Sequence, residues 1–270
     1  MNKGAKILYV CQELMPYLPE NPVSALCRQL PQQIQERGAE IRTFVPKFGS
    51  INERRNQLHE VIRLSGMNII IDDCDHQLII KVASIPSARM QIYFIDNDDY
   101  FTRKHVVHDD DGNYFEDNDE RAIFFARGII ETTSKLRWSP DIIHCHNWFS
   151  AIMPVYIKRL YADDPLYANS KIVITLYNDS FPESLNENFA SKLESEGVAA
   201  DELSILENPT HENLLKFAIQ YADGVIVADE NVNQNIIDYA RESGTKVLIK
   251  TEKTDYVDAY DEFYSSLLEG

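Results

Sequence analysis

Short unbroken apolar runs alternate with amphipathic helical patterns along most of the chain, and this alternation predicts an α/β protein. The first run, residues 7–11 (ILYVC), is typical of a parallel strand that is covered on both faces. A helix follows it, because Asn21 and Pro22 form an N-cap and a first-turn proline, and Gly38 provides a C-terminal stop. Further strands are predicted at 40–46, 141–144, 171–177, 224–228 and 246–250. Helices are predicted at 119–135, 148–161, 187–195, 211–221, 230–242 and 255–268.

Between residues 60 and 96 the pattern changes to closely spaced strand candidates. These lie at 61–64, 67–71, 77–83 and 90–95, with turn-like residues between them. They predict an antiparallel β-meander inserted into a single Rossmann-like, mostly parallel sheet that carries helices on both faces. The domain is expected to span 1–254, with a C-terminal helix at 255–270.

The loop that leaves the first strand, 13–22, is expected to lie over any active site, since ligands of open α/β sheets bind outside the carboxyl ends of the strands. Loops that hold phosphate groups use glycine, so that backbone N–H groups can approach the ligand. This loop has no glycine and contains Pro16, Pro19 and Pro22, which have no N–H group. The position of this loop therefore suits a nucleotide-using enzyme, whereas its residues do not suit the binding of phosphate groups.

The charge balance limits the classes of partner that the chain is expected to bind. The chain has 26 basic and 43 acidic residues, a net charge of −17. Such a surface repels nucleic-acid backbones and anionic lipid, so neither partner is expected. No apolar run approaches a membrane span, and the apolar stretch near the N-terminus is too short for a signal peptide. The scattered Cys11, Cys27, Cys74 and Cys145 are interpreted as buried reduced thiols of a cytoplasmic protein, and no cofactor is predicted.

The stretch DIIHCHNW (141–148) is the best candidate for chemistry. His144 and His146 are two residues apart at a strand end, so their side chains share a face. A metal site with Asp141 as a third ligand is one interpretation, but packed or hydrogen-bonded histidines are favoured, and no metal is predicted. The histidines and aspartates of 105–111 are interpreted as a solvated loop. No nucleophile motif of the GxSxG type is present.

Six ordered segments resemble the N-terminal domain of bacterial glycogen and starch synthases. They are KILYVCQELMPYLP, LPQQIQERGAEIRTFVPKFG, IYFIDNDDYF, YFEDNDERAIFFARG, PDIIHCHNW and ITLYN, and the resemblance covers roughly residues 5 to 240. The family consists of ADP-glucose-dependent retaining glycosyltransferases with two Rossmann-like domains, the GT-B architecture. The resemblance therefore implies half of a GT-B enzyme.

The resemblance also implies a sugar site. The positions that match the family's pattern line the glucose and acceptor side of its cleft or hold its loops; they are Glu13, Tyr93, Asp96, Asp117, Asn118, Arg121, His144, His146, Trp148 and Asn178. Structural alternatives stay open. Asp117, Asn118 and Arg121 span one helical turn and could cap and brace it, and Tyr93 and Trp148 are favoured as core residues.

The chain departs from the family at its donor side. Residues 19–25 (PENPVSA) replace Lys-Thr-Gly-Gly-Leu-Ala-Asp, residues 146–149 (HNWF) replace His-Asp-Trp-His, and Tyr177-Asn178 replaces His-Asn. The second Rossmann-like domain, which supplies most of the family's ADP-glucose site, has no counterpart in these 270 residues. No residue is therefore predicted to be catalytic.

Three functions remain open at this stage. The first is a glycogen/starch synthase-like protein without autonomous catalysis, which acts as a glucan-binding or regulatory module with an α-glucan or a glycogen enzyme as partner. The second is a glucosyltransferase subunit completed by a separate donor-domain chain. The third is a non-enzymatic scaffold or small-ligand protein. The helix at 255–268 resembles the helix that crosses back onto the N-terminal domain in GT-B enzymes, although an ordinary amphipathic terminal helix explains its apolar stripe equally well.

Overall fold

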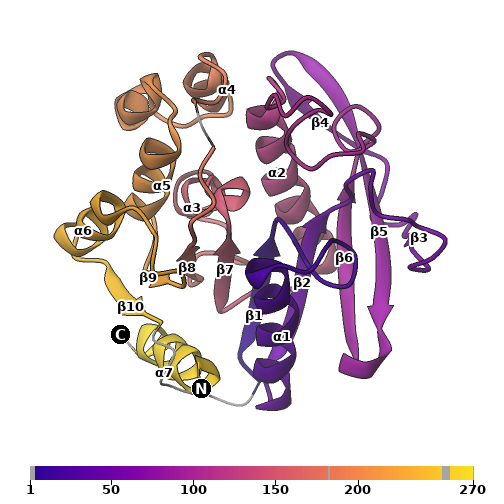
Figure 1. Cartoon of the computed structure of the whole chain (residues 1–270), viewed down its shortest axis with the longest axis horizontal. Helices are drawn as coiled ribbons and strands as arrows, with labels where there is room; N and C mark the ends of the chain where they lie inside the picture. The colour runs from indigo at the N-terminus through magenta and orange to yellow at the C-terminus, as the bar shows by residue number, and fades with distance from the viewer. Residues whose placement is uncertain (1–3, 182, 251–255, 270) are drawn as a thin grey trace.

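A computed structural model describes residues 4–181, 183–250 and 256–269, which form one large twisted sheet with helices packed against it (Figure 1). The strands are β1 Lys6–Cys11, β2 Glu40–Pro46, β3 His59–Glu60, β4 Met67–Ile71, β5 Cys74–Ile85, β6 Met90–Asp96, β7 Ile142–His146, β8 Lys171–Leu176, β9 Gly224–Val227 and β10 Lys246–Ile249. The α-helices are α1 Pro22–Glu36, α2 Asn118–Leu136, α3 Met153–Val155, α4 Phe189–Ser195, α5 His211–Gln220, α6 Gln234–Glu242 and α7 Tyr256–Leu268. The 3-10 helices are η1 Pro86–Ala88, η2 Trp148–Ser150 and η4 Ala200–Glu207, and η3 Tyr156–Leu160 is π-helical.

The sheet confirms the predicted fold class. Its strand order is β10-β9-β8-β7-β1-β2-β6-β5-β3, with β4 paired to β5. Every pair from β10 to β6 is parallel, and β1 lies in the middle, between β2 and β7. The carboxyl ends of these strands therefore meet along one edge, where a ligand site of an α/β sheet is expected.

The predicted meander is only partly correct. Residues 61–64 are not a strand: the backbone N–H of Leu64 donates to the carbonyl of Val61 at 2.9 Å, which closes a turn. Strand β6 pairs in parallel with β2, so it belongs to the main sheet, and only β5, β3 and β4 extend that sheet with antiparallel pairs. Apolar runs predict strands, but they do not determine which neighbour a strand pairs with.

The helix predicted at 148–161 is also wrong. It is divided into η2, α3 and η3, and Pro154 lies in the first turn of α3, at a position that would be interior in a helix starting at residue 148. Proline cannot donate to the carbonyl four residues earlier, so a regular helix does not run through this segment. The 3-10 helix η4 was not predicted, because its residues lack a clear apolar period.

Helices α1 and α7 lie next to each other against the centre of the sheet, although they come from opposite ends of the chain (Figure 1). The hydroxyl of Tyr256 on α7 donates to Oε1 of Gln33 on α1. The buried side chains of α7 are Val257, Tyr260, Phe263, Tyr264 and Leu267. The predicted boundary between residues 254 and 255 lies outside the described residues. None of the described helices has both the length and the apolar character needed to cross a bilayer.

Candidate functional site

The two histidines of β7 form the centre of a buried polar cluster. The ring centroids of His144 and His146 are 4.0 Å apart, which confirms that the side chains share a face. Nδ1 of His144 is hydrogen-bonded to the Tyr264 hydroxyl at 2.6 Å, and its Nε2 to Oγ1 of Thr175 at 2.6 Å. Burial, followed by the neighbouring His146, holds the pKa of His144 well below its usual range. The His144 ring is therefore neutral and satisfied by hydrogen bonds.

His146 is buried as completely as His144. Its Nδ1 is hydrogen-bonded to the Tyr177 hydroxyl at 2.6 Å, and its exposed fraction is 0%. Tyr177 stands where the family's pattern has a histidine. The residue that differs from the family is therefore the one that occupies Nδ1 of His146. A metal site with Asp141 is wrong, because the Asp141 carboxylate accepts a hydrogen bond from the Lys6 backbone N–H at 2.7 Å, at the opposite end of the strand.

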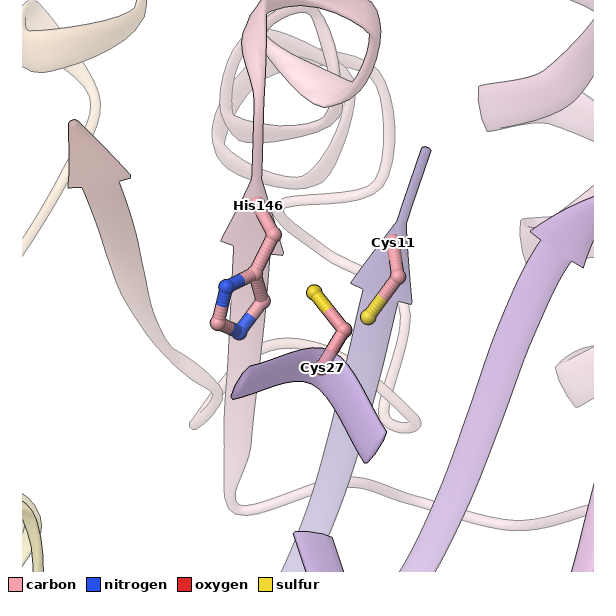
Figure 2. Close-up of side chains that lie close together, drawn as sticks. All are labelled: Cys11, Cys27 and His146. Carbon is pink, nitrogen blue, oxygen red and sulfur yellow. The ribbon is translucent and has the colours of Figure 1, made fainter. Parts of the chain in front are cut away.

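Two of the scattered cysteines lie beside His146, although no sequence motif links them. Figure 2 shows Cys11 at the end of β1 and Cys27 on α1, with both sulfur atoms on the same side of the His146 ring. All three residues are buried, as is Cys145. Cys74 is exposed, so the prediction that all four thiols are buried is wrong at this position. Cys74 opens β5 directly after a turn, where one face of the strand meets solvent.

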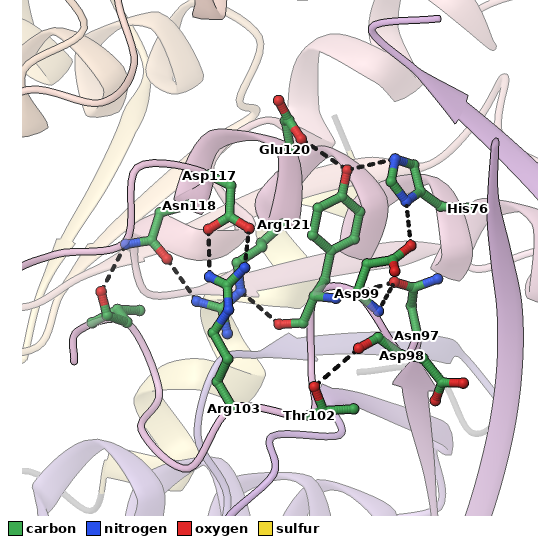
Figure 3. A network of polar contacts seen from close by, with 12 residues as sticks. His76, Asn97, Asp98, Asp99, Thr102, Arg103, Asp117, Asn118, Glu120 and Arg121 are labelled. Carbon is green, nitrogen blue, oxygen red and sulfur yellow. Dashed lines mark hydrogen bonds and ion pairs between the residues drawn. The ribbon is translucent and has the colours of Figure 1, made fainter. Parts of the chain in front are cut away.

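Asp117, Asn118 and Arg121 form a second network, which holds the loop before α2 (Figure 3). Arg121 is fully buried; its Nε donates to the Tyr100 carbonyl at 2.9 Å and its Nη1 to Oδ1 of Asn118 at 2.6 Å. Asp117 pairs with Arg103. Burial lowers the pKa of Arg121 to about 10. These contacts support the interpretation that the three residues brace the start of the helix.

The other positions implied by the resemblance are dispersed. Tyr93 stacks on Phe44 with a centroid distance of 4.8 Å. Asp96 is buried and pairs with Lys81 at 2.7 Å; burial, the largest effect, raises the pKa of Asp96 above its usual range.

Two further positions lie within the protein's own contacts, and one is exposed. The Glu13 carboxylate accepts a hydrogen bond from Asn21, the N-cap of α1. Trp148 is buried against Phe181, with ring centroids 4.9 Å apart. Asn178 is exposed just after β8. The structure therefore does not bring the ten positions together into one ligand cleft.

A groove lies instead beside Trp148, at the carboxyl edge of the sheet. It consists of two adjoining cavities of about 390 and 330 Å³ that share Phe181 and Glu183 in their walls. The first extends under residues 112–118, and the second reaches the start of α5. These volumes lie in the range of small-ligand sites.

The groove is acidic and rich in amides and aromatic rings. Its lining includes the carboxylates of Glu116, Asp179, Glu183 and Glu212, the amides of Asn113, Asn118, Asn178, Asn186, Asn231 and Asn233, and the rings of Tyr114, Phe115, Tyr177 and Phe181. Among the described lining residues there is no lysine or arginine, and His211 is the single basic residue. An anionic ligand such as a diphosphate would meet repulsion here, whereas a neutral polyhydroxyl ligand would find hydrogen-bond partners and ring faces.

Asp179 organises the floor of the groove. Its Oδ2 accepts hydrogen bonds from Nδ2 of Asn147 at 3.0 Å and from the Trp148 backbone N–H at 3.3 Å. Its Oδ1 lies 3.3 Å from Nε2 of His211. Burial, then the Asp179 charge, raises the pKa of the Tyr114 hydroxyl. Sequence reasoning missed Asp179, Phe181 and His211; the one available signal was that Asp179 follows a buried strand at its carboxyl end.

Comparisons with known proteins agree with the fold and with the resemblance. A family model described as "Starch synthase catalytic domain" matches residues 6–251. A glycogen synthase of Chlorobium limicola is 37% identical over 65% of this chain and 36% of its own length. A glycogen synthase of Chlorobaculum tepidum is 32% identical over 87% of this chain and 48% of its own length.

A solved structure shares the fold. The catalytic domain of starch synthase IV from Arabidopsis thaliana, bound to ADP and acarbose, matches with a TM-score of 0.71 and 18% identity. The match covers 92% of this chain and 51% of that chain. The chain thus spans about half the length, or less, of the relatives that it matches.

Proposed function

Because this chain belongs to the starch synthase catalytic domain family, we propose that its 270 residues bind an α-glucan in the acidic groove and do not transfer glucose from ADP-glucose by themselves. The observation that carries the proposal is the groove lining, which combines aromatic rings, amides and carboxylates and includes no lysine or arginine among the described residues. Sugar rings present apolar faces and hydroxyl groups, which suit such a lining. The role is that of a glucan-binding or regulatory module.

The residues on the donor side support the proposal that the chain does not transfer glucose from ADP-glucose by itself. The loop between β1 and α1 contains Pro16 and Pro19 and is followed by Pro22 at the start of α1, and its Asn21 side chain is engaged in a capping box with Ser24. His146, at the adjacent strand end, is closed by Tyr177. Glycosyl transfer from a nucleotide-sugar requires donors directed at the departing phosphate, and losing one such donor commonly lowers the rate by about 10²–10³. This loop offers neither glycine nor a basic side chain for that task.

The alternative of a subunit completed by a separate donor-domain chain requires an apolar docking surface beside the strand ends. Among the described residues, the exposed large apolar side chains are Ile62, Ile70, Tyr114 and Ile249. They come from different elements, and only Tyr114 lies at the groove. A polar rim therefore favours a module that binds sugar over a half-enzyme that awaits a partner.

Calorimetric titration with maltoheptaose and, separately, with ADP-glucose tests the proposal. We expect saturable binding of maltoheptaose and no heat from ADP-glucose. Tyr114→Ala removes a ring from the groove wall and should weaken maltoheptaose binding about tenfold. Tyr239→Ala is the matched control, because Tyr239 is a partly exposed tyrosine on α6, outside the groove.

Three results would contradict the proposal. Tight binding of ADP-glucose would show that the donor site is functional. Elongation of a glucan by the purified chain would show autonomous catalysis. Absence of maltoheptaose binding at millimolar concentration, with the fold intact, would exclude the groove as a glucan site.

A further inference from the structure

Cys11, Cys27 and His146 come together from three elements that are not neighbours in the sequence. Cys11 ends β1, Cys27 lies on α1 and His146 ends β7 (Figure 2). The two sulfur atoms and one imidazole nitrogen all lie within 4.8 Å of one another. Among the described residues this is the one group of three or more histidine, cysteine and carboxylate side chains with metal-ligand spacing.

The imidazole supplies a second, independent observation. Nδ1 of His146 is hydrogen-bonded to Tyr177, whereas Nε2 is buried and makes no hydrogen bond of normal geometry among the described residues. The Cys27 thiol is the neighbouring group that interacts with this ring. A buried polar atom without a partner is costly and uncommon in a native fold. A ligand that takes up the Nε2 lone pair would remove this cost.

We propose that Cys11, Cys27 and His146 bind one thiophilic metal ion, Zn²⁺ or Cu⁺, in the interior of the domain. Thiolate sulfur and imidazole nitrogen are the types of ligand that such ions select. Binding replaces the two thiol protons by bonds to the metal, and the protons are released to solvent. No electron is transferred, so no oxidant or reductant is needed.

The spacing suits such an ion after a small adjustment. With metal–sulfur bonds of about 2.3 Å and metal–nitrogen bonds of about 2.0–2.1 Å, ligand atoms around one ion lie roughly 3.5–4 Å apart. The observed upper bound of 4.8 Å is longer than this spacing by about 1 Å. A change in the χ1 angle of one side chain can move its ligand atom by that distance.

Tyr177 has the role of an outer partner. Its hydroxyl can accept the Nδ1 proton of His146, which leaves the Nε2 lone pair directed away from Tyr177 and available to the metal. The ion would connect β1, α1 and β7 across the sheet centre and fix the loop that runs from Cys11 to Pro22. All three ligands have an exposed fraction of 0%, so we expect the metal to enter during folding rather than by exchange with the folded chain.

The test measures metal in full-length protein produced separately in zinc-supplemented and copper-supplemented cells and purified without chelator. We expect one zinc or one copper ion per chain by elemental analysis. Cobalt-grown protein should show the near-ultraviolet absorption of thiolate-to-cobalt charge transfer. Refolding with Zn²⁺ should give a higher thermal midpoint than refolding with EDTA.

Matched cysteine variants locate the site. Cys27→Ser should lose the metal, whereas Cys145→Ser should keep it, because Cys145 is an equally buried thiol on β7 that is not part of the group. Metal-free wild-type protein from both media, full occupancy in Cys27→Ser, or a Cys11–Cys27 disulfide in freshly purified protein would overturn the proposal. If Cys27→Ser does not fold, the cobalt spectrum of the wild-type protein decides, because only thiolate ligation produces that band.

Discussion

The hydroxyl of Tyr264 on the last helix is hydrogen-bonded to Nδ1 of His144 in the central part of the sheet, at 2.6 Å and across 120 residues of sequence. The same hydroxyl lies 3.4 Å from the hydroxyl of Tyr9 on β1. All three groups are buried. A histidine that the family resemblance implies for sugar binding is thus sealed by the protein's own C-terminal helix.

Tyr264→Phe should lower the free energy of unfolding by about 1–3 kcal/mol. The substitution leaves a buried imidazole nitrogen without its partner, and the full desolvation penalty of that group then opposes folding. Urea denaturation measures the change. Tyr239→Phe is the control: its hydroxyl bond to Gln220 is exposed, so the loss should stay within about 0.5 kcal/mol. Equal effects of the two substitutions would argue against a structural role of the buried bond.

Deletion of residues 255–270 should abolish cooperative folding at 37 °C. Each of the five buried side chains of α7 contributes about 1.5–3 kcal/mol by burial, which together is on the order of 10 kcal/mol and equals the usual net stability of a domain. Removal also exposes the polar cluster around His144. Calorimetric melting decides the matter, and an unchanged midpoint would show that α7 is dispensable.

Alkaline stability should depend on Tyr167. Burial, the largest effect, raises the pKa of this phenol to about 12, above the ordinary value of about 10, although hydrogen bonds with Ser134 and Thr133 oppose the rise. Because the folded state holds the proton more tightly, the contribution is complete below pH 10 and is lost as the pH rises to 12.

The measurement compares slopes rather than absolute stabilities. Between pH 10 and 12, Tyr167→Phe should show a decline in unfolding free energy that is shallower than that of the wild type by roughly 1 kcal/mol per pH unit. Urea denaturation at several pH values gives both slopes. Identical slopes in the two proteins would contradict the assignment of the raised pKa to Tyr167.

Gly49→Ala should destabilise the protein by about 3 kcal/mol, because the loop after β2 passes very close to a second loop. The Gly49 N–H donates to the Arg103 carbonyl at 3.0 Å, and an added Cβ would lie 2.1 Å from the Thr102 carbonyl oxygen. Gly66→Ala is the comparison, because a Cβ at Gly66 meets nothing within 4 Å and only its φ of +86° opposes alanine. The cost there should be about 1 kcal/mol. Thermal melting measures both losses of stability. A larger loss in Gly66→Ala than in Gly49→Ala would contradict this interpretation of the loop contact.

Figure 3 shows the polar contacts that Asp117, Asn118 and Arg121 make within this chain. Arg121 is a position that matches the family's pattern, and its spacing of one helical turn from Asp117 leaves open whether it faces a ligand or braces the helix. Its guanidinium is enclosed by the loop residue Tyr100, by Asn118 at the start of α2 and by aromatic rings, including Phe101 at 5.4 Å. Sequence spacing could not distinguish the two roles, because only the path of the loop determines whether solvent reaches the side chain.

The sequence by itself determined most strands, most helices, the mostly parallel character of the sheet and the resemblance to the family. These follow from apolar runs, caps and ordered segments, which are properties of neighbouring residues. Tertiary structure alone decided that β6 joins β2, that Tyr177 and Tyr264 close the histidines, that Cys11, Cys27 and His146 converge, and that the groove lies beside Asp179 and Phe181. The physical reason is that these features depend on distances between side chains far apart in the sequence, and packing sets those distances only once the chain has folded.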